Sequence, residues 1–89
     1  MTAEEIMLQV DTLGATEFTM EERRHLKRFF LNEYCSKWMS ISSIAKATGI
    51  MDSSRQMVYR SIKLVQNNRQ YWLMAHRINH AIKKKLPKL

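Results

Sequence analysis

Four polar side chains recur at helical spacing in the second half of the chain, and their chemistry is hydrogen bonding to nucleic-acid bases and phosphates. Gln56, Arg60, Lys63 and Asn67 fall on one side of a helix, and Tyr59 flanks them. Arginine bonds guanine in bidentate fashion, glutamine and asparagine bond adenine, and lysine or tyrosine bonds phosphate. The spacing therefore predicts a helix face that reads DNA, with an ordinary solvated helix face as the alternative.

The other side of the same helix is built to pack against a core. Val58, Ser61, Ile62 and Val65 share this side, and the polar run at positions 52–54 (Asp-Ser-Ser) supplies good helix N-caps. We therefore expect a helix over about 53–67 whose apolar side faces inward and whose polar side faces solvent or a partner.

A shorter helix precedes this one. Ile41, Ile44 and Ala45 share one of its faces, and it ends at Gly49, for which we expect the left-handed conformation of many helix ends. Ala45 is small enough for two helices to cross closely. The segments ISSIAKATGI and VYRSIKLV together resemble the helix-turn-helix and winged-helix transcription regulators of small bacterial, plasmid or phage type. The resemblance covers about a third of the chain, and the eight residues between Gly49 and Val58 make the connection about one helical turn longer than in the tight form of the motif.

The resemblance implies a sequence-specific regulator that inserts the helix around 53–67 into the major groove of double-stranded DNA. It implies a compact, winged-helix-like all-α fold, and the alternative is the same fold with a minimal pair of β-strands added. The candidate DNA-binding residues are Ser53, Arg55, Gln56, Tyr59, Arg60, Lys63 and Asn67 on the second helix, with Lys46 and Arg69 on either side of it.

Charge is divided unevenly along the 89 residues. Residues 1–22 contain six acids and no base, whereas residues 23–89 contain fifteen bases and two acids, so the two segments carry −6 and +13. A basic segment of this size repels itself unless it meets a polyanion such as nucleic acid. Duplex DNA is favoured over RNA, because the deep major groove of RNA excludes side chains and the chain lacks aromatic motifs for stacking single strands.

The length corresponds to one domain, 1–89, with the helix-turn-helix at 40–67. We expect an acidic helix over 1–14 and a support helix over 19–36, each opened by a capping box at Thr2 and Thr19. The stripe of the first helix packs on its own domain or on a second subunit, and its acids are candidates to restrain the basic body until DNA displaces them. A homodimer is the default for so small a core.

The support helix has two expected faces. Leu26, Phe29, Phe30 and Tyr34 form its apolar face, and the basic cluster at positions 23, 24, 27 and 28 (Arg23, Arg24, Lys27 and Arg28) serves either phosphate contacts or solubility. The junction after it, 36–41, is where winged-helix proteins often have a short strand, and Trp38 is expected to anchor it in the core.

The last segment, 69–86, is expected to be a basic helix. Tyr71, Ala75, Ile78 and Ile82 share one side at a 3.6-residue period, whereas the alternative, a wing over 69–78, lacks the turn residues of a hairpin. The lysines at 83–85 suit a helix C-terminus and are also candidate phosphate contacts.

Other functions have less support. We expect no enzyme, cofactor or metal site, because the sequence has no phosphate loop or nucleophile elbow and His76 and His80 lack further ligands nearby. The single Cys35 fits a buried residue in a reducing compartment, and no stretch is long and apolar enough for a membrane span. We therefore expect a cytoplasmic, nucleoid-associated protein.

Two alternatives use other surfaces. The first is an adaptor or inhibitor that binds RNA polymerase, another regulator or a nuclease through exposed Met51, Met57, Leu64 and Leu73. The second is a basic helix that lies on an anionic membrane through Tyr71, Trp72 and the lysines at 83–85.

Overall fold

The computed structural model describes residues 1–49 and 54–85, and the described chain is all-helical. In chain order the helices are α1 (Ala3–Gly14), α2 (Met20–Cys35), α3 (Ile41–Thr48), α4 (Arg55–Asn67) and α5 (Arg69–Lys85). No strand occurs in these two ranges, and residues 69–78 belong to α5, so the alternative of a wing there is wrong. The all-α prediction is confirmed.

Local sequence signals set the helix starts. Thr2 and Thr19 each accept a hydrogen bond from the third residue of the following helix, and Glu5 and Glu22 bond back to the caps, so both predicted capping boxes are present. Hydrogen bonding to Thr19 lowers the pKa of the Glu22 carboxyl. Ser40 and Ser54 cap α3 and α4 in the same way with their hydroxyls.

The end of α3 differs from the expectation for Gly49. This glycine has φ −92° and ψ 159°, which is extended rather than left-handed backbone. The amide of Gly49 donates to the Ala45 carbonyl (2.8 Å), and the hydroxyl of Thr48 donates to the Ile44 carbonyl (2.8 Å). The last turn of α3 thus bonds the Ala45 and Ile44 carbonyls, and the chain leaves the helix in an extended conformation, so the expectation of a left-handed Gly49 is wrong.

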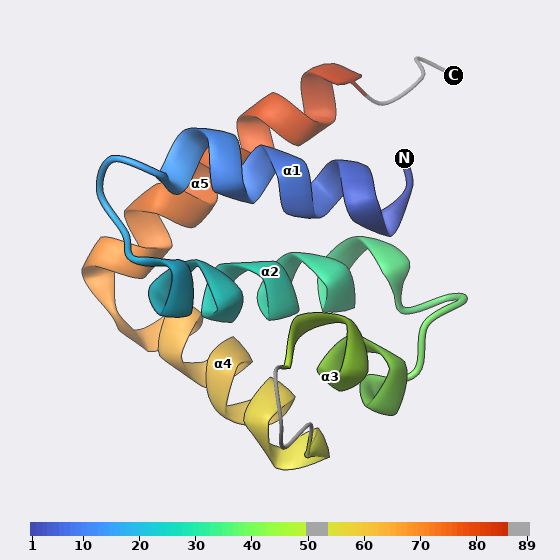
Figure 1. The fold of residues 1–89 in the computed structure, drawn as a ribbon. Coiled ribbons are helices and arrows are strands. Elements are labelled where there is room, and N and C mark those ends of the chain that lie inside the picture. Colours follow the sequence, from blue (N-terminus) through green and yellow to red (C-terminus); the bar gives the residue numbers. More distant parts are fainter. Residues whose placement is uncertain (50–53, 86–89) are drawn as a thin grey trace.

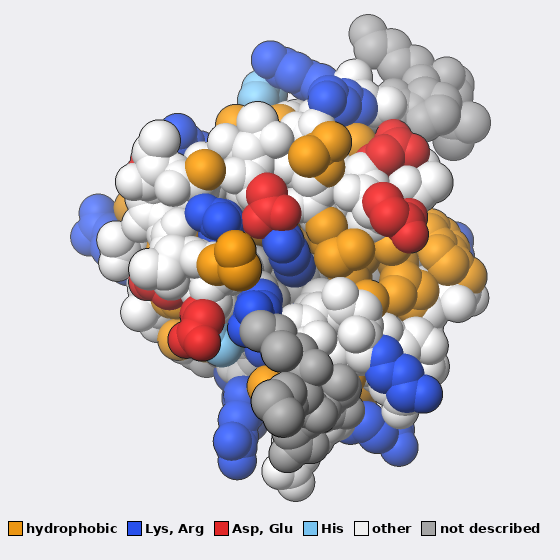
Figure 2. Space-filling view, viewed as in Figure 1, with side chains coloured by type: hydrophobic (Ala, Val, Ile, Leu, Met, Phe, Trp, Pro, Cys, Tyr) orange, Lys and Arg blue, Asp and Glu red, His pale blue; other side chains and the backbone are white. Residues whose placement is uncertain are grey.

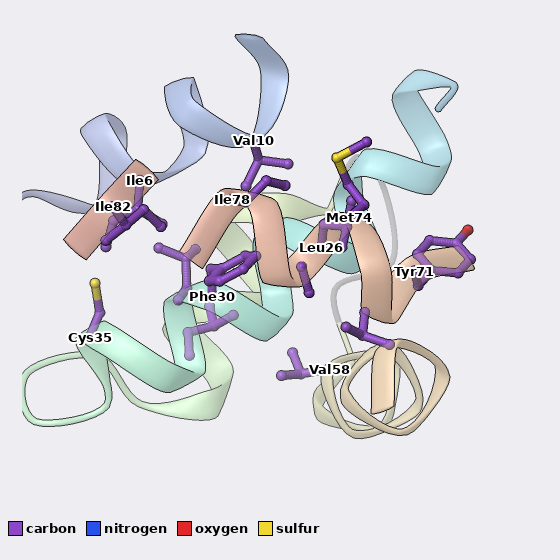
Figure 3. Packing of buried hydrophobic residues seen from close by; sticks show 14 of the residues in the cluster. Ile6, Val10, Leu26, Phe30, Cys35, Val58, Tyr71, Met74, Ile78 and Ile82 are labelled. Carbon is purple, nitrogen blue, oxygen red and sulfur yellow. The ribbon is translucent and has the colours of Figure 1, made fainter. Parts of the chain in front are cut away.

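Helix α2 lies in the centre of the molecule (Figure 1), between α1 and α5 on one side and α3 and α4 on the other. The core therefore runs along both sides of α2. Leu26 and Phe30 of α2 meet Ile6 and Val10 of α1 and Ile78 of α5 on the first side (Figure 3). On the other side the buried apolar residues are Ile44, Ala45, Val58 and Val65.

The turn between α2 and α3 does not contain the expected anchor. Trp38 is 62% exposed, and its amide closes a turn with the Cys35 carbonyl (3.1 Å). Buried Cys35 occupies the interior position at the end of α2 instead, as a free thiol whose pKa is raised by burial. The prediction that Trp38 anchors the junction is wrong, whereas the burial of Cys35 is confirmed.

Candidate nucleic-acid interface

The outer face of α4 brings together most of the predicted DNA-binding residues. The side of α4 that carries Val58, Ser61 and Val65 is buried against the rest of the protein. The opposite side is exposed, with Tyr59 at 49%. We call this surface the α4 face, and its residues are Arg55, Gln56, Tyr59, Arg60, Lys63 and Asn67.

The remaining candidates lie at the margins of this face or beyond it. Lys46 is exposed on α3, and Arg69 is exposed at the first position of α5. Within the α4 face, Asn67 turns its side-chain amide back onto the Lys63 carbonyl (2.9 Å), so this group already bonds its own helix. Ser53 lies outside the described residues.

The bases of the α4 face are free of ion pairs among the described residues. The salt bridges of 1–49 and 54–85 join Asp11 to Arg23 (3.1 Å) and Lys27 (2.8 Å), and Glu17 to Arg77 (2.7 Å). Figure 2 shows acidic side chains over α1 and the start of α2, and basic side chains projecting near α3 and α4. Of the acids of α1, Asp11 binds Arg23 and Lys27 of the support helix, and none is paired with a base of the α4 face within the described ranges. The restraint of the basic body by the α1 acids stays a prediction.

The basic cluster of α2 is largely engaged inside the protein. Arg23 and Lys27 are partly buried and bind Asp11, and Arg23 also donates to the Phe18 carbonyl (2.9 Å). Arg28 is only 4% exposed. Neither predicted role, phosphate contact or solubility, applies to Arg28, because its guanidinium is turned toward α3 and α4.

Arg28 joins the three helices that carry the candidate interface. Its Nε donates to Thr48 Oγ1 at the end of α3 (3.0 Å), and its Nη1 donates to Ser61 Oγ in the middle of α4 (3.2 Å). Burial, and then the charge of nearby Arg24, lower the pKa of the guanidinium, which still remains protonated at neutral pH. One buried side chain thus fixes α3 and α4 to α2 with directional bonds.

His25 completes this buried polar cluster. Its Nδ1 lies 2.9 Å from Ser61 Oγ, and Ser61 Oγ donates its only hydrogen to the Met57 carbonyl (2.8 Å). Ser61 must therefore accept from both Arg28 and His25, which places a hydrogen on Nδ1 of His25. Burial first, and then the Arg28 charge, lower the pKa of His25, so the ring is neutral at neutral pH. We call Arg28, His25, Thr48 and Ser61 the polar clamp.

The sequence contains a signal for the burial of Arg28 within the polar clamp. At 100° per residue, Arg28 falls on the same side of α2 as Leu31 and Cys35, both of which are buried. An arginine that shares a helix face with apolar residues is expected to be buried, whereas an arginine on a polar face is expected to be exposed to solvent. The prediction of a single apolar face for α2 places Arg28 in the basic cluster instead.

A small cavity lies between α2 and α5, away from the α4 face. It has a volume of about 110 Å³, and its lining consists of Phe29, Phe30, Glu33, Trp72, Ala75, His76 and Asn79. Among the residues described, no group of three or more His, Cys, Asp or Glu side chains is placed to hold a metal ion. The pair His76 and His80 is exposed on α5.

The surface predicted for an adaptor is only partly available. Leu73 is 54% exposed, but Met57 and Leu64 are partly buried, and Met51 lies outside the described residues. The lysines at 83–85 lie at the end of α5 that is remote from α4 (Figure 1), so they do not extend the α4 face. No helix in the described ranges combines the length and apolar character needed to cross a bilayer.

Comparison of the chain with protein-family models, with curated proteins and with solved structures finds no match.

Proposed function

We propose that the protein is a regulator of transcription that binds double-stranded DNA with sequence preference and places α4 in the major groove. The observation that carries the proposal is the α4 face. It combines two arginines, a lysine, a glutamine and a tyrosine on the exposed side of one 13-residue helix. These are the residue types that hydrogen-bond base edges and phosphates in a groove about 12 Å wide, which admits one helix.

The charge around α4 supports an anionic partner. The sequence from Ser53 onward contains no acid. The described ion pairs leave Arg55, Arg60 and Lys63 uncommitted, so a phosphate backbone would meet them without first breaking a salt bridge. Release of counterions from the DNA would then add to affinity and make binding depend on salt.

The inner side of α4 supports specific rather than purely electrostatic binding. Hydrogen-bond readout of bases requires donors that are held in a fixed position relative to the groove. Ser61 is buried in the polar clamp at the centre of α4, and Val58 and Val65 pack on either side of it. Arg60 and Lys63, next to this fixed segment, are therefore the residues we assign to base readout.

Selection from a pool of random duplexes tests the proposal, followed by binding of the selected and a scrambled duplex at several salt concentrations. We expect Arg60→Ala to weaken binding to the selected duplex by about tenfold or more, as for loss of a bidentate base contact. Binding to the scrambled duplex should fall much less.

Lys84→Ala is the matched control, because it removes one positive charge from the far end of the molecule. Equal losses for Arg60→Ala and Lys84→Ala would show that binding is electrostatic attachment without readout. Failure to enrich any duplex, or stronger enrichment of RNA from a parallel pool, would contradict the proposal.

A further inference from the structure

His25 lies where three helices meet, and it is the member of the polar clamp that titrates near neutral pH. Its ring belongs to α2, its Nδ1 bonds Ser61 Oγ of α4 (2.9 Å), and Tyr71 of α5 packs edge-on against it with ring centroids 6.0 Å apart. Ser61 is fully buried, whereas His25 is only partly buried. The ring therefore contacts both solvent and the hydroxyl that fixes the middle of α4.

Ser61 Oγ brings two nitrogen donors onto one oxygen. His25 Nδ1 lies 2.9 Å from this oxygen, and Arg28 Nη1 lies 3.2 Å from it. The distance between the two nitrogens therefore cannot exceed about 6 Å, the sum of these two distances. Because the guanidinium is always charged, a proton on His25 places a second positive charge within this distance, in an interior that screens charge less than water does.

The groups around the ring do not neutralise a second positive charge. On α2 the nearby acids are Glu21 and Glu22, but Glu22 already accepts a hydrogen bond from the amide of its N-cap (2.9 Å), and Glu21 is exposed. The contacts from α4 and α5 are Ser61 and Tyr71, which carry no charge at neutral or mildly acidic pH. Within the part of the chain that the structure describes, no carboxylate forms an ion pair with His25 or with the guanidinium beside it.

We propose that His25 is a positioning residue whose protonation releases α4 and reduces sequence readout of DNA, an inference that rests on the proposed function. In the neutral state, His25 and Arg28 both hold Ser61. When Nε2 of His25 takes up a proton, the two cations repel each other, and the partly buried ring moves toward solvent and leaves Ser61. The middle of α4 then keeps only its bond to Arg28.

Readout and total attraction to DNA should respond to pH in opposite directions. Burial and then the Arg28 charge lower the pKa of His25 below 6.5, so readout should be complete above about pH 6.5 and decline as the pH falls through the lowered pKa. Protonation of His25, His76 and His80 adds positive charge, which strengthens attachment to any duplex. The ratio of the affinities for the selected and the scrambled duplex is therefore the quantity that reports readout.

Binding of both duplexes at several pH values between 7.5 and 5 tests the proposal. In the unchanged chain, the affinity ratio should fall by about threefold or more over this range and recover when the pH is returned to 7.5. His25→Gln keeps a donor for Ser61 but does not titrate, so its ratio should stay within about 1.5-fold.

Two controls separate His25 from general effects of acid. His76→Gln and His80→Gln remove the other two imidazole rings, which are exposed on α5, and each variant should keep the pH dependence of the unchanged chain. Circular dichroism gives the pH range over which each chain keeps its helices, and the ratios are compared within that range. Unfolding of the unchanged chain before the His25 ring titrates would contradict the proposal.

Nuclear magnetic resonance of the free chain tests the release of α4 without DNA. The backbone amides of α4 around Ser61 should shift with the same midpoint as the His25 ring, while the amides of α1 should not. Arg28→Met removes the neighbouring charge, so the pKa of the His25 ring should rise in this variant.

The proposal is overturned if His25→Gln shows the same pH dependence of the affinity ratio as the unchanged chain. It is also overturned if the ratio stays constant while the His25 ring titrates, or if the amides of α4 do not follow the ring. Absence of any duplex preference at pH 7.5 would instead contradict the proposed function, and the titration of the free chain would still decide whether protonation of His25 releases α4.

Discussion

The two sides of α2 are held by different kinds of interaction. Toward α1 and α5, the described interior consists of apolar side chains such as Phe30, Ile6 and Ile78. Toward α3 and α4, apolar residues share the interior with the polar clamp of Arg28, His25, Thr48 and Ser61. Burial of apolar surface stabilises without direction, whereas hydrogen bonds fix distance and angle. Apolar burial therefore stabilises both sides, and on the second side the hydrogen bonds also determine where the candidate interface lies.

The largest effect is expected from the apolar side. Phe30 of α2 is fully buried against α1 and α5. Phe30→Ala should therefore lower the free energy of unfolding by about 3–5 kcal/mol through lost burial and the resulting cavity. Urea unfolding followed by circular dichroism measures the loss. Phe30→Leu is the control and should cost less than half as much. A loss below about 1 kcal/mol would contradict a continuous core on this side.

The next largest loss of stability is expected from the side of α2 that contains the polar clamp. Arg28→Ala removes two hydrogen bonds and a buried stem, for a loss of about 2–3 kcal/mol in the free energy of unfolding. The same urea experiment measures it. Arg24→Ala is the matched control, since Arg24 is a partly buried neighbour on α2. If the two variants unfold alike, the clamp does not stabilise the fold.

A companion variant separates stability from position. Arg28→Met keeps much of the buried volume but removes the hydrogen bonds, and replacing a buried charge by an apolar group often costs little stability. We expect Arg28→Met to be more stable than Arg28→Ala and yet to bind the selected duplex more weakly than the unchanged chain. Full duplex binding by Arg28→Met would show that the clamp does not position α4.

A smaller effect is expected from pH. Burial and the Arg28 charge lower the pKa of folded His25 below its ordinary value of 6.5, so the unfolded chain binds a proton more readily. Stability from this group is complete above about pH 6.5 and is lost as the pH falls from there through the lowered pKa. Glu21 and Glu22 oppose this shift, and Tyr71 packs edge-on against the ring.

Thermal unfolding between pH 7.5 and 5 measures this dependence. His25→Gln keeps a donor for Ser61 but does not titrate, so its melting temperature should change less over the same range. Equal pH slopes for the two chains would contradict the proposed role of His25.

The smallest effect is expected from the ion pairs at the surface of α1. Asp11→Asn removes the negative charge that pairs with Arg23 and Lys27, and we expect a loss of about 0.5–1 kcal/mol because the carboxylate is partly exposed to water. Urea unfolding at low and high salt measures it. Glu4→Gln, on the same helix, is the control. A loss that does not shrink in high salt would contradict an electrostatic origin.

Local features of the fold were predictable from the sequence. The capping boxes at Thr2 and Thr19, the cap of α4 at Ser54, and the 3.6-residue period of α5 depend on residues three or four positions apart, and the structure confirms them. The α4 face belongs to this class, because a helix that buries Val58, Ser61 and Val65 must expose the opposite residues.

Features that depend on distant segments were not predicted. Arg28 bonds residues that lie 20 and 33 positions away, so its burial required knowledge of how α3 and α4 pack on α2. Trp38 is exposed and Gly49 is extended for a related reason. Both residues lie between helices, where the conformation depends on how the flanking helices pack and not on the local sequence. The sequence pattern of α2 indicated one apolar face. In the structure, helices pack against α2 on both sides, so two of its faces are buried.

The central position of α2 has a consequence for how the chain folds. Because α1, α3 and α4 all pack against this helix, no group of the other helices reproduces the core without it. Opening of α2 should therefore coincide with unfolding of the whole domain, and the backbone amides around Phe30 and Leu31 should exchange with solvent only through global unfolding, with the global free energy of unfolding. The amides at the ends of the peripheral helices should exchange earlier by local fraying.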